Sequence, residues 1–278
     1  GGVLPGPIPN PEVKPSCVDS CTVAREPTGT FVAVPLSFTP HQLQYYWRSH
    51  SSGQLGGTMT ITTGDILGHT QVGVYLSVVG DILFHPRALD DEAVEELATS
   101  FDMEMHPFLV GGSSLLGSLL RGNSRGIAVA DIATEEELDE LTSFCDVVVM
   151  ESGVNAAGNL IECNEHGAVV SPVVPQNGVD MIGEVLGIDA IRCKIAGHDT
   201  VGSMLVANGK GALAHPDISK TEAEAIEAAM KVPVMVGTVT FGSPYVGAGC
   251  AASDAHALVG SGSTGPELNR IEDALGLI

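Results

Sequence analysis

A pair of glycines separated by four residues occurs five times along the chain at nearly constant spacing. The pairs are Gly68/Gly73, Gly112/Gly117, Gly153/Gly158, Gly197/Gly202 and Gly242/Gly247, and successive second glycines are 44, 41, 44 and 45 residues apart. One G-x₄-G followed by a serine, as at Ser118, has the spacing of a phosphate-binding loop, but that loop needs a lysine after its second glycine. None of the five pairs has this lysine. The recurrence therefore indicates a structural repeat of about 43 residues rather than a nucleotide site.

Each repeat carries the same succession of local signals. An Asn-x-x-Gly turn begins six residues after the second glycine in three repeats, at Asn123, Asn164 and Asn208, and predicts a hairpin between two short strands. A helix start follows, as capping boxes at Thr134/Glu137, Thr221/Glu224 and Thr264/Glu267 and as single N-caps at Asp90 and Asn177. We predict strand, hairpin, strand, helix and a short third strand such as "DVVVM" or "VPVMV".

A repeat of this size cannot bury its helix face alone, so neighbouring repeats must cover it. The last repeat ends in "IEDALGLI", which is apolar up to the final residue, whereas an open array needs polar end caps. Closure into a ring removes both ends and their exposed strand edges. We therefore predict an α/β fold of five repeats around a pseudo-fivefold axis, at about 64–107, 108–151, 152–194, 195–237 and 238–278.

Residues 1–58 differ from the rest of the chain. They contain eight of the sixteen prolines, the single tryptophan (Trp47), and three acidic and three basic residues, without apolar periodicity. We expect a disordered extension that need not belong to the natural product, since it begins on glycine, with Met59 as a candidate start of a folded domain over 59–278. A short docking motif in "HQLQYYWRSH" is the alternative for this segment.

The formal net charge is −22, and residues 59–278 carry all of it, with 31 acidic and 9 basic side chains. Such a surface repels phosphates, which argues against a direct grip on nucleic acid. Two causes stay open, a salt-adapted surface and a basic macromolecular partner. No 18-residue apolar span and no leader peptide stand out, so we expect a cytoplasmic protein without a membrane partner.

The six cysteines are scattered apart from Cys17-x₃-Cys21, and no Cys/His group has zinc spacing. We therefore expect free thiols and neither a metal nor another cofactor. His85 and His215 each precede a proline at the end of equivalent predicted strands. A metal pair is the alternative there, but packing or turn roles suit these positions better.

Four stretches carry a resemblance to a known family: "GGSSLLGSLLRGNSRGI", "GNLIECNEHGAVVSP", "VGSMLVANGKGALAHP" and "GSTGPELNRIEDALGLI". Over Gly64 to Ile278 the chain resembles the translation initiation factor 6 family in its archaeal form. The resemblance implies a pentein fold, with five ββαβ units and helices lining the interior. It also implies a monomer that binds the intersubunit face of the large ribosomal subunit and blocks premature joining of the small subunit. Eukaryotic members act in large-subunit maturation as well.

The implied partners are basic ribosomal proteins beside the sarcin–ricin loop, which an acidic domain suits by charge. We expect the contacts in the G-x₄-G turns and at the start of the following strands. The candidate residues are Ser113, Ser114, Gly117, Ser118, Ala157, Gly158, Asn159, Thr200, Val201 and Ser203. The alternative is that these small residues only let five strands converge near the axis.

Two other function classes compete with this interpretation. Pentein folds also include guanidine-modifying enzymes, which need a cysteine nucleophile with a histidine and carboxylates. Cys250, Asp254 and His256 are the nearest such set, but the repeat places Cys250 in a strand and the other two in a hairpin turn. We therefore expect no enzyme. A generic acidic binding scaffold is the third class.

Overall fold

The computed structural model describes residues 21–25, 31–35, 60–151 and 153–278. The chain forms two compact units, Gly1–Gly57 and Thr58–Ile278. In the first unit, β1 (Cys21–Arg25) pairs with β2 (Phe31–Pro35) in antiparallel fashion. The rest of the predicted extension, with the "HQLQYYWRSH" motif, lies outside the described residues, and so does Met59. The disorder of the extension and the start at Met59 stay predictions.

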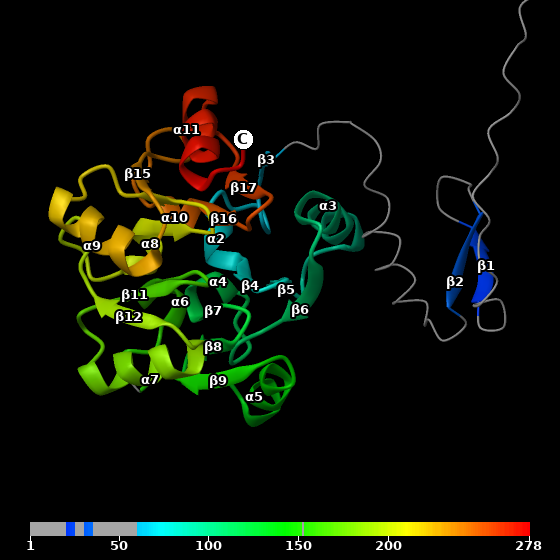
Figure 1. The fold of residues 1–278 in the computed structure, drawn as a ribbon, viewed down its shortest axis with the longest axis horizontal. Coiled ribbons are helices and arrows are strands. Elements are labelled where there is room, and N and C mark those ends of the chain that lie inside the picture. Colours follow the sequence, from blue (N-terminus) through cyan, green and yellow to red (C-terminus); the bar gives the residue numbers. More distant parts are fainter. Residues whose placement is uncertain (1–20, 26–30, 36–59, 152) are drawn as a thin grey trace, which may run out of the picture. The chain divides into compact units, whose positions relative to one another are not determined.

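The described part of the second unit contains five three-stranded sheets (Figure 1). In each sheet the first two strands form an antiparallel hairpin and the third strand pairs with the second in parallel. The sheets are β4 (Ser77–Val79), β5 (Ile82–Pro86) and β6 (Glu104–Phe108); β7 (Leu120–Gly122), β8 (Gly126–Val129) and β9 (Asp146–Val149); β10 (Ile161–Cys163), β11 (Gly167–Val170) and β12 (Asp189–Arg192); β13 (Leu205–Ala207), β14 (Ala212–Ala214) and β15 (Val234–Val236); and β16 (Cys250–Ala252), β17 (Ala257–Gly260) and β3 (Ile61–Gly64). The predicted fivefold α/β repeat is confirmed.

The ring closes through a strand that precedes the first repeat. β3 pairs in parallel with β17, with Ile61 opposite Ala257 and Gly64 opposite Gly260. Just before this strand, the Thr60 hydroxyl donates to Glu272 Oε1 at 2.9 Å. The start and the end of the domain therefore share one sheet, which leaves the fifth sheet with the same three strands as the others. Repeats counted from residue 64 omit this strand.

Two kinds of helix alternate along the ring. The longer helices lie around the outside (Figure 1): α3 (Asp91–Phe101), α5 (Glu135–Thr142), α7 (Gln176–Leu186), α9 (Lys220–Met230) and α11 (Gly265–Leu275). Five four-residue helices each follow a G-x₄-G turn: α2 (Val72–Tyr75), α4 (Leu116–Leu119), α6 (Ala157–Leu160), α8 (Val201–Met204) and α10 (Val246–Gly249). Each short helix contacts the next, and α10 contacts α2. The helices that line the interior are thus one-turn helices that the sequence patterns did not predict.

Three predicted helix starts are correct. Asp90 accepts from the Ala93 amide at 2.9 Å, and Thr134 forms a reciprocal capping box with Glu137. Glu267 accepts from the amide of Thr264 at 2.7 Å.

The other two predicted starts are wrong. The N-cap of α9 is Ser219, which forms a capping box with Glu222, rather than Thr221 with Glu224. Both pairs have the same spacing, and the local pattern alone does not choose between them. The N-cap of α7 is Pro175 rather than Asn177, because Pro175 has the extended backbone of an N-cap and the helix begins directly after it.

The predicted hairpin asparagines also join neighbouring repeats. Asn164 Oδ1 accepts two amides of its own turn, while its Nδ2 donates at 3.0 Å to the carbonyls of Asn208 and Met230 in the next repeat. Asn123 and Asn208 make the equivalent contacts with the repeats that follow them. Each asparagine therefore ties its hairpin both to the next hairpin and to the end of the next long helix.

The two glycines of each G-x₄-G pair have different roles. The first glycines adopt left-handed backbone, with φ of +79°, +79°, +94°, +80° and +95°, which favours glycine. The second glycines meet at the axis. A Cβ on Gly158 would overlap the backbone oxygen of Gly117, and the same relation runs through every second glycine around the ring back to Gly73 against Gly247. The spacing thus encodes one turn followed by one close backbone contact.

We predict that Gly158→Ala strongly destabilises the domain. The atoms that the added Cβ would overlap belong to the backbone of Gly117, so no flexible side chain can move aside to make room. We expect the free energy of unfolding to fall by about 3 kcal/mol or more. Chemical denaturation of the purified protein measures it. Gly265→Ala is the control, because its added Cβ meets no atom within 4 Å. Equal stability of the two variants would contradict the proposed axial packing.

Candidate functional site

Each G-x₄-G turn follows the third strand of a sheet, and this strand runs parallel to the second strand, so the turns lie at the end opposite the hairpins. We call this end the turn face and define it by residues 65–71, 109–115, 153–156, 194–200 and 238–245. In three repeats the turn is closed by a two-residue bridge, Ile66 to His69, Val110 to Ser113 and Ile195 to His198. Their two central residues all have positive φ: Leu67 and Gly68, Gly111 and Gly112, Ala196 and Gly197. The fifth turn bridges Val239 to Ser243 and is one residue longer. Three of the turns therefore share one backbone conformation but carry different side chains, and the fifth turn departs from it.

The sequence-predicted contact residues divide by burial. Gly117, Ser118, Ala157, Gly158 and Val201 are buried around the axis. Ser113, Ser114, Asn159 and Ser203 are half-buried and Thr200 is exposed. The structure brings Asn159 and Ser203 together across two repeats, with Ser203 Oγ donating to Asn159 Oδ1 at 3.2 Å. The accessible part of the predicted set is thus Ser113, Ser114, Asn159, Thr200 and Ser203.

Helix-capping glutamates hold the turns in place. Glu137, in the first turn of α5, accepts from the amide of Gly111 at 2.7 Å as well as capping its own helix. Glu267, in the first turn of α11, accepts from the amides of Phe241 and Gly242 at 3.2 and 2.8 Å. Burial opposes ionisation of Glu267, but hydrogen bonds from Thr264, Gly242 and Thr238 outweigh it and lower its pKa to about 2. The sequence revealed the capping boxes but not this second contact.

This pKa predicts acid sensitivity. A carboxyl whose pKa is lowered on folding stabilises the fold above its ordinary pKa of 4.5, and that contribution disappears as the pH falls toward 2. Glu267→Gln should therefore melt below the wild type at pH 7, and the difference should shrink at pH 3. Glu136→Gln, at an exposed position of α5, is the control and should show no such change. A melting difference for Glu267→Gln that is equal at both pH values would contradict this role.

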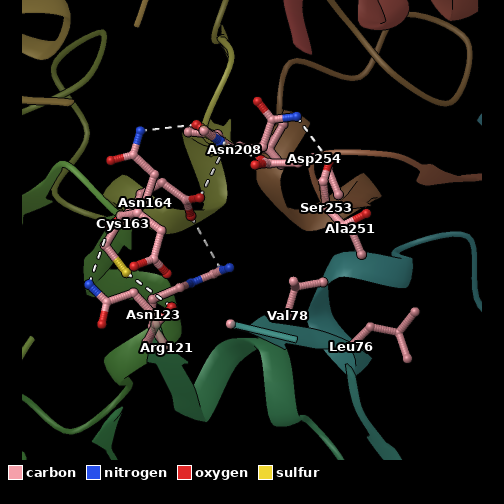
Figure 2. Close-up of a pocket in the computed structure, with 18 of the residues that line it drawn as sticks. Leu76, Val78, Arg121, Asn123, Cys163, Asn164, Asn208, Ala251, Ser253 and Asp254 are labelled. Carbon is pink, nitrogen blue, oxygen red and sulfur yellow. Dashed lines mark hydrogen bonds and ion pairs between the residues drawn. The ribbon is translucent and has the colours of Figure 1, made fainter. Parts of the chain in front are cut away.

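An axial cavity of about 500 Å³ lies among the hairpins (Figure 2). The middle residues of the five first strands line it: Val78, Arg121, Glu162, Val206 and Ala251. Arg121 Nη2 lies 3.5 Å from Glu162 Oε2, and Glu162 is 2% exposed. Burial raises the pKa of Glu162 to about 7, although Arg121 and the Ala207 amide oppose the shift. The cavity therefore holds one buried ion pair in an otherwise apolar ring.

The candidate nucleophile set does not form a catalytic arrangement. Cys250 is buried, and burial raises the pKa of its thiol to about 12, whereas a nucleophilic cysteine needs a lowered pKa. His256 Nε2 lies 2.9 Å from Thr62 Oγ1, and its ring packs edge-on against Phe101. Asp254 accepts from the Gly209 amide at 2.6 Å. Each residue thus contacts a different neighbour.

The histidines and cysteines have local roles. His85 Nδ1 contacts the Pro86 carbonyl, and His215 Nδ1 accepts from the Asp217 amide. Cys145, Cys163, Cys193 and Cys250 are free thiols. Across the described ranges, no cluster of three or more His, Cys, Asp or Glu side chains could hold a metal ion. The helices in these ranges are also too short or too polar to cross a bilayer.

Comparisons with known proteins agree with the fivefold architecture. The eIF-6 family model matches residues 61–274, from β3 to α11. Translation initiation factor 6 of Haloquadratum walsbyi is 38% identical over 213 residues, which cover 76% of this chain and 94% of that protein. The proteins of the same name from Methanoculleus marisnigri and Saccharolobus islandicus are 37% and 36% identical, over 98% and 100% of their lengths and 78% of this chain. The chain belongs to the eIF-6 family.

Proposed function

We propose that this protein binds the large ribosomal subunit at its intersubunit face, prevents premature association with the small subunit, and acts in large-subunit biogenesis. The observation that supports this proposal is the family match over residues 61–274, which includes all five sheets and their closing strand. The matched relatives carry the name translation initiation factor 6. A guanidine-modifying activity has no comparable support, because the Cys250 thiol is buried with a raised pKa.

The turn face is the proposed binding surface. It presents the accessible candidates Ser113, Ser114 and Thr200 beside four exposed apolar side chains, Leu67, Leu115, Phe241 and Tyr245. The candidates Asn159 and Ser203 follow two of the turns, on the short helices α6 and α8. Apolar groups among small polar ones are what a protein interface uses for close packing. The acidic domain suits basic ribosomal proteins and is unsuited to a direct contact with RNA phosphates. We propose that the protein acts as a cytoplasmic monomer.

Sedimentation with purified subunits tests the function directly. The protein should pellet with large subunits, not with small ones, and should reduce the formation of joined ribosomes when the two are mixed. Binding to neither subunit would point to a different partner for the acidic domain and would overturn the proposal.

We predict that Asn159→Trp blocks docking without unfolding the domain. Asn159 is half-buried beside Ser203 on the short helices, where an indole would stand between the turns and a partner surface. We expect at least a tenfold loss of affinity, about 1.4 kcal/mol, with little change in melting temperature. Met181→Trp, at a 51% exposed position of α7, is the matched control. Normal binding by Asn159→Trp would place the bound surface elsewhere on the ring.

We also predict how binding depends on salt. If the charge of −22 attracts a basic partner, added salt should slow association much more than it speeds dissociation. Surface-attached large subunits in a flow-binding assay give both rates. Equal effects of salt on the two rates would argue that the acidity reflects the composition of the protein and does not steer binding.

A further inference from the structure

The fifth turn differs from the other described turns in its backbone. Thr240, Phe241 and Gly242 have φ of 44°, 62° and 95°, so three successive residues are left-handed. Two of them carry a Cβ and one is bulky, which makes this conformation unfavourable for the isolated chain. Such a backbone persists only where surrounding contacts hold it, and these positions concentrate at functional sites.

Side chains at the start of α11 hold this turn from several directions. The Thr240 amide donates to Ser263 Oγ at 2.9 Å, and the amides of Phe241 and Gly242 donate to the carboxylate of Glu267. That carboxylate also accepts from the hydroxyl of Thr238 at 2.8 Å. The left-handed backbone is therefore part of a fixed hydrogen-bonded arrangement.

This arrangement presents the ring of Phe241 to solvent. Phe241 is 83% exposed, more than any other large apolar side chain in the described ranges, and Tyr245 of the same turn is 47% exposed. At the equivalent position of the other turns lie Leu67, Gly111 and Ala196. A ring held outward on an unfavourable backbone adds little to the stability of the monomer. It has the properties of an interface anchor, since aromatic residues dominate binding energy when a partner buries them.

We propose that Phe241 is the anchor by which the turn face docks, with its ring buried in an apolar pocket of a basic protein. The inference rests on the proposed function, because it takes the basic partner protein to be a component of the large ribosomal subunit. The net charge of −22 favours a pocket rimmed by arginine or lysine, whose cations also attract an aromatic face. Stacking of the ring on an RNA base is the competing contact, and the acidic surface disfavours it.

Phe241→Asn separates anchoring from folding. Asparagine tolerates left-handed backbone but removes the ring, so the melting temperature should stay equal or rise while affinity for large subunits falls at least 30-fold. The loss should appear mainly as faster dissociation. Lys231→Asn places an asparagine on a left-handed residue outside the turn face, the C-cap of α9 with φ of 56°, and should bind within twofold of the wild type. Phe241→Tyr keeps the ring and should restore most of the affinity.

Each other result overturns a specific statement. Wild-type affinity for Phe241→Asn would overturn the anchor and leave the proposed function intact. A parallel fall in melting temperature and affinity would make Phe241 a structural residue. Failure of the wild type to bind large subunits would overturn the proposed function and the anchor together.

A photo-crosslinking residue at position 241 then identifies the contact. p-Benzoylphenylalanine keeps an aromatic ring there, and irradiation of the complex should join it to a basic ribosomal protein. A crosslink to ribosomal RNA would overturn the protein pocket in favour of base stacking.

Discussion

The structure depends on the close contact between backbone segments of neighbouring repeats at the axis of the ring. Five second glycines each lie against the carbonyl of the previous one, and no side chain fits between them. Because the contact repeats around a closed ring, it fixes the distance of every one-turn helix from the axis. The first strands follow directly from these helices, so the same contact sets the width of the cavity that they line.

Polar groups complete the ring at its two ends in different ways. At the hairpin end, Asn123, Asn164 and Asn208 join one repeat to the next. At the turn face, Glu137 and Glu267 each join one turn to the long helix of the same repeat. Apart from the Thr238 hydroxyl, which also donates to Glu267, the groups of the turns that these carboxylates bind are backbone amides, so the other side chains of the turns do not enter the contact. This leaves those side chains available for a partner.

A buried ion pair and two buried cysteines line the axial cavity. Arg121 and Glu162 form an ion pair and also contact backbone groups, and burial raises the pKa of both lining cysteines, Cys163 and Cys250. A buried ion pair contributes little net stability, since desolvation of both charges offsets their attraction. Among the middle residues of the five first strands, only Arg121 and Glu162 are charged, and the other three are Val78, Val206 and Ala251. We therefore propose the turn face rather than the cavity as the binding surface.

The sequence by itself determined the repeat, its order of strands and helices, and three of the five long-helix starts. It did so because turn glycines, hairpin asparagines and capping residues act locally and recur at fixed spacing. It also indicated the family and the turns that carry the candidate site. It could not choose Ser219 over Thr221, because both have the same capping pattern. It placed the first repeat at residue 64, since the role of β3 appears only when the ring closes onto β17.

Only the tertiary structure decided which candidate residues are accessible. Gly117 and Gly158 are buried while Ser113 and Asn159 are not, because burial here depends on contacts between repeats that lie about 40 residues apart. The exposure of Phe241 could not be predicted from the sequence either, because a single aromatic residue between threonine and glycine matches no motif that indicates exposure or burial. It is the Glu267 carboxylate, 26 residues further along the chain, that holds the turn and directs the ring outward.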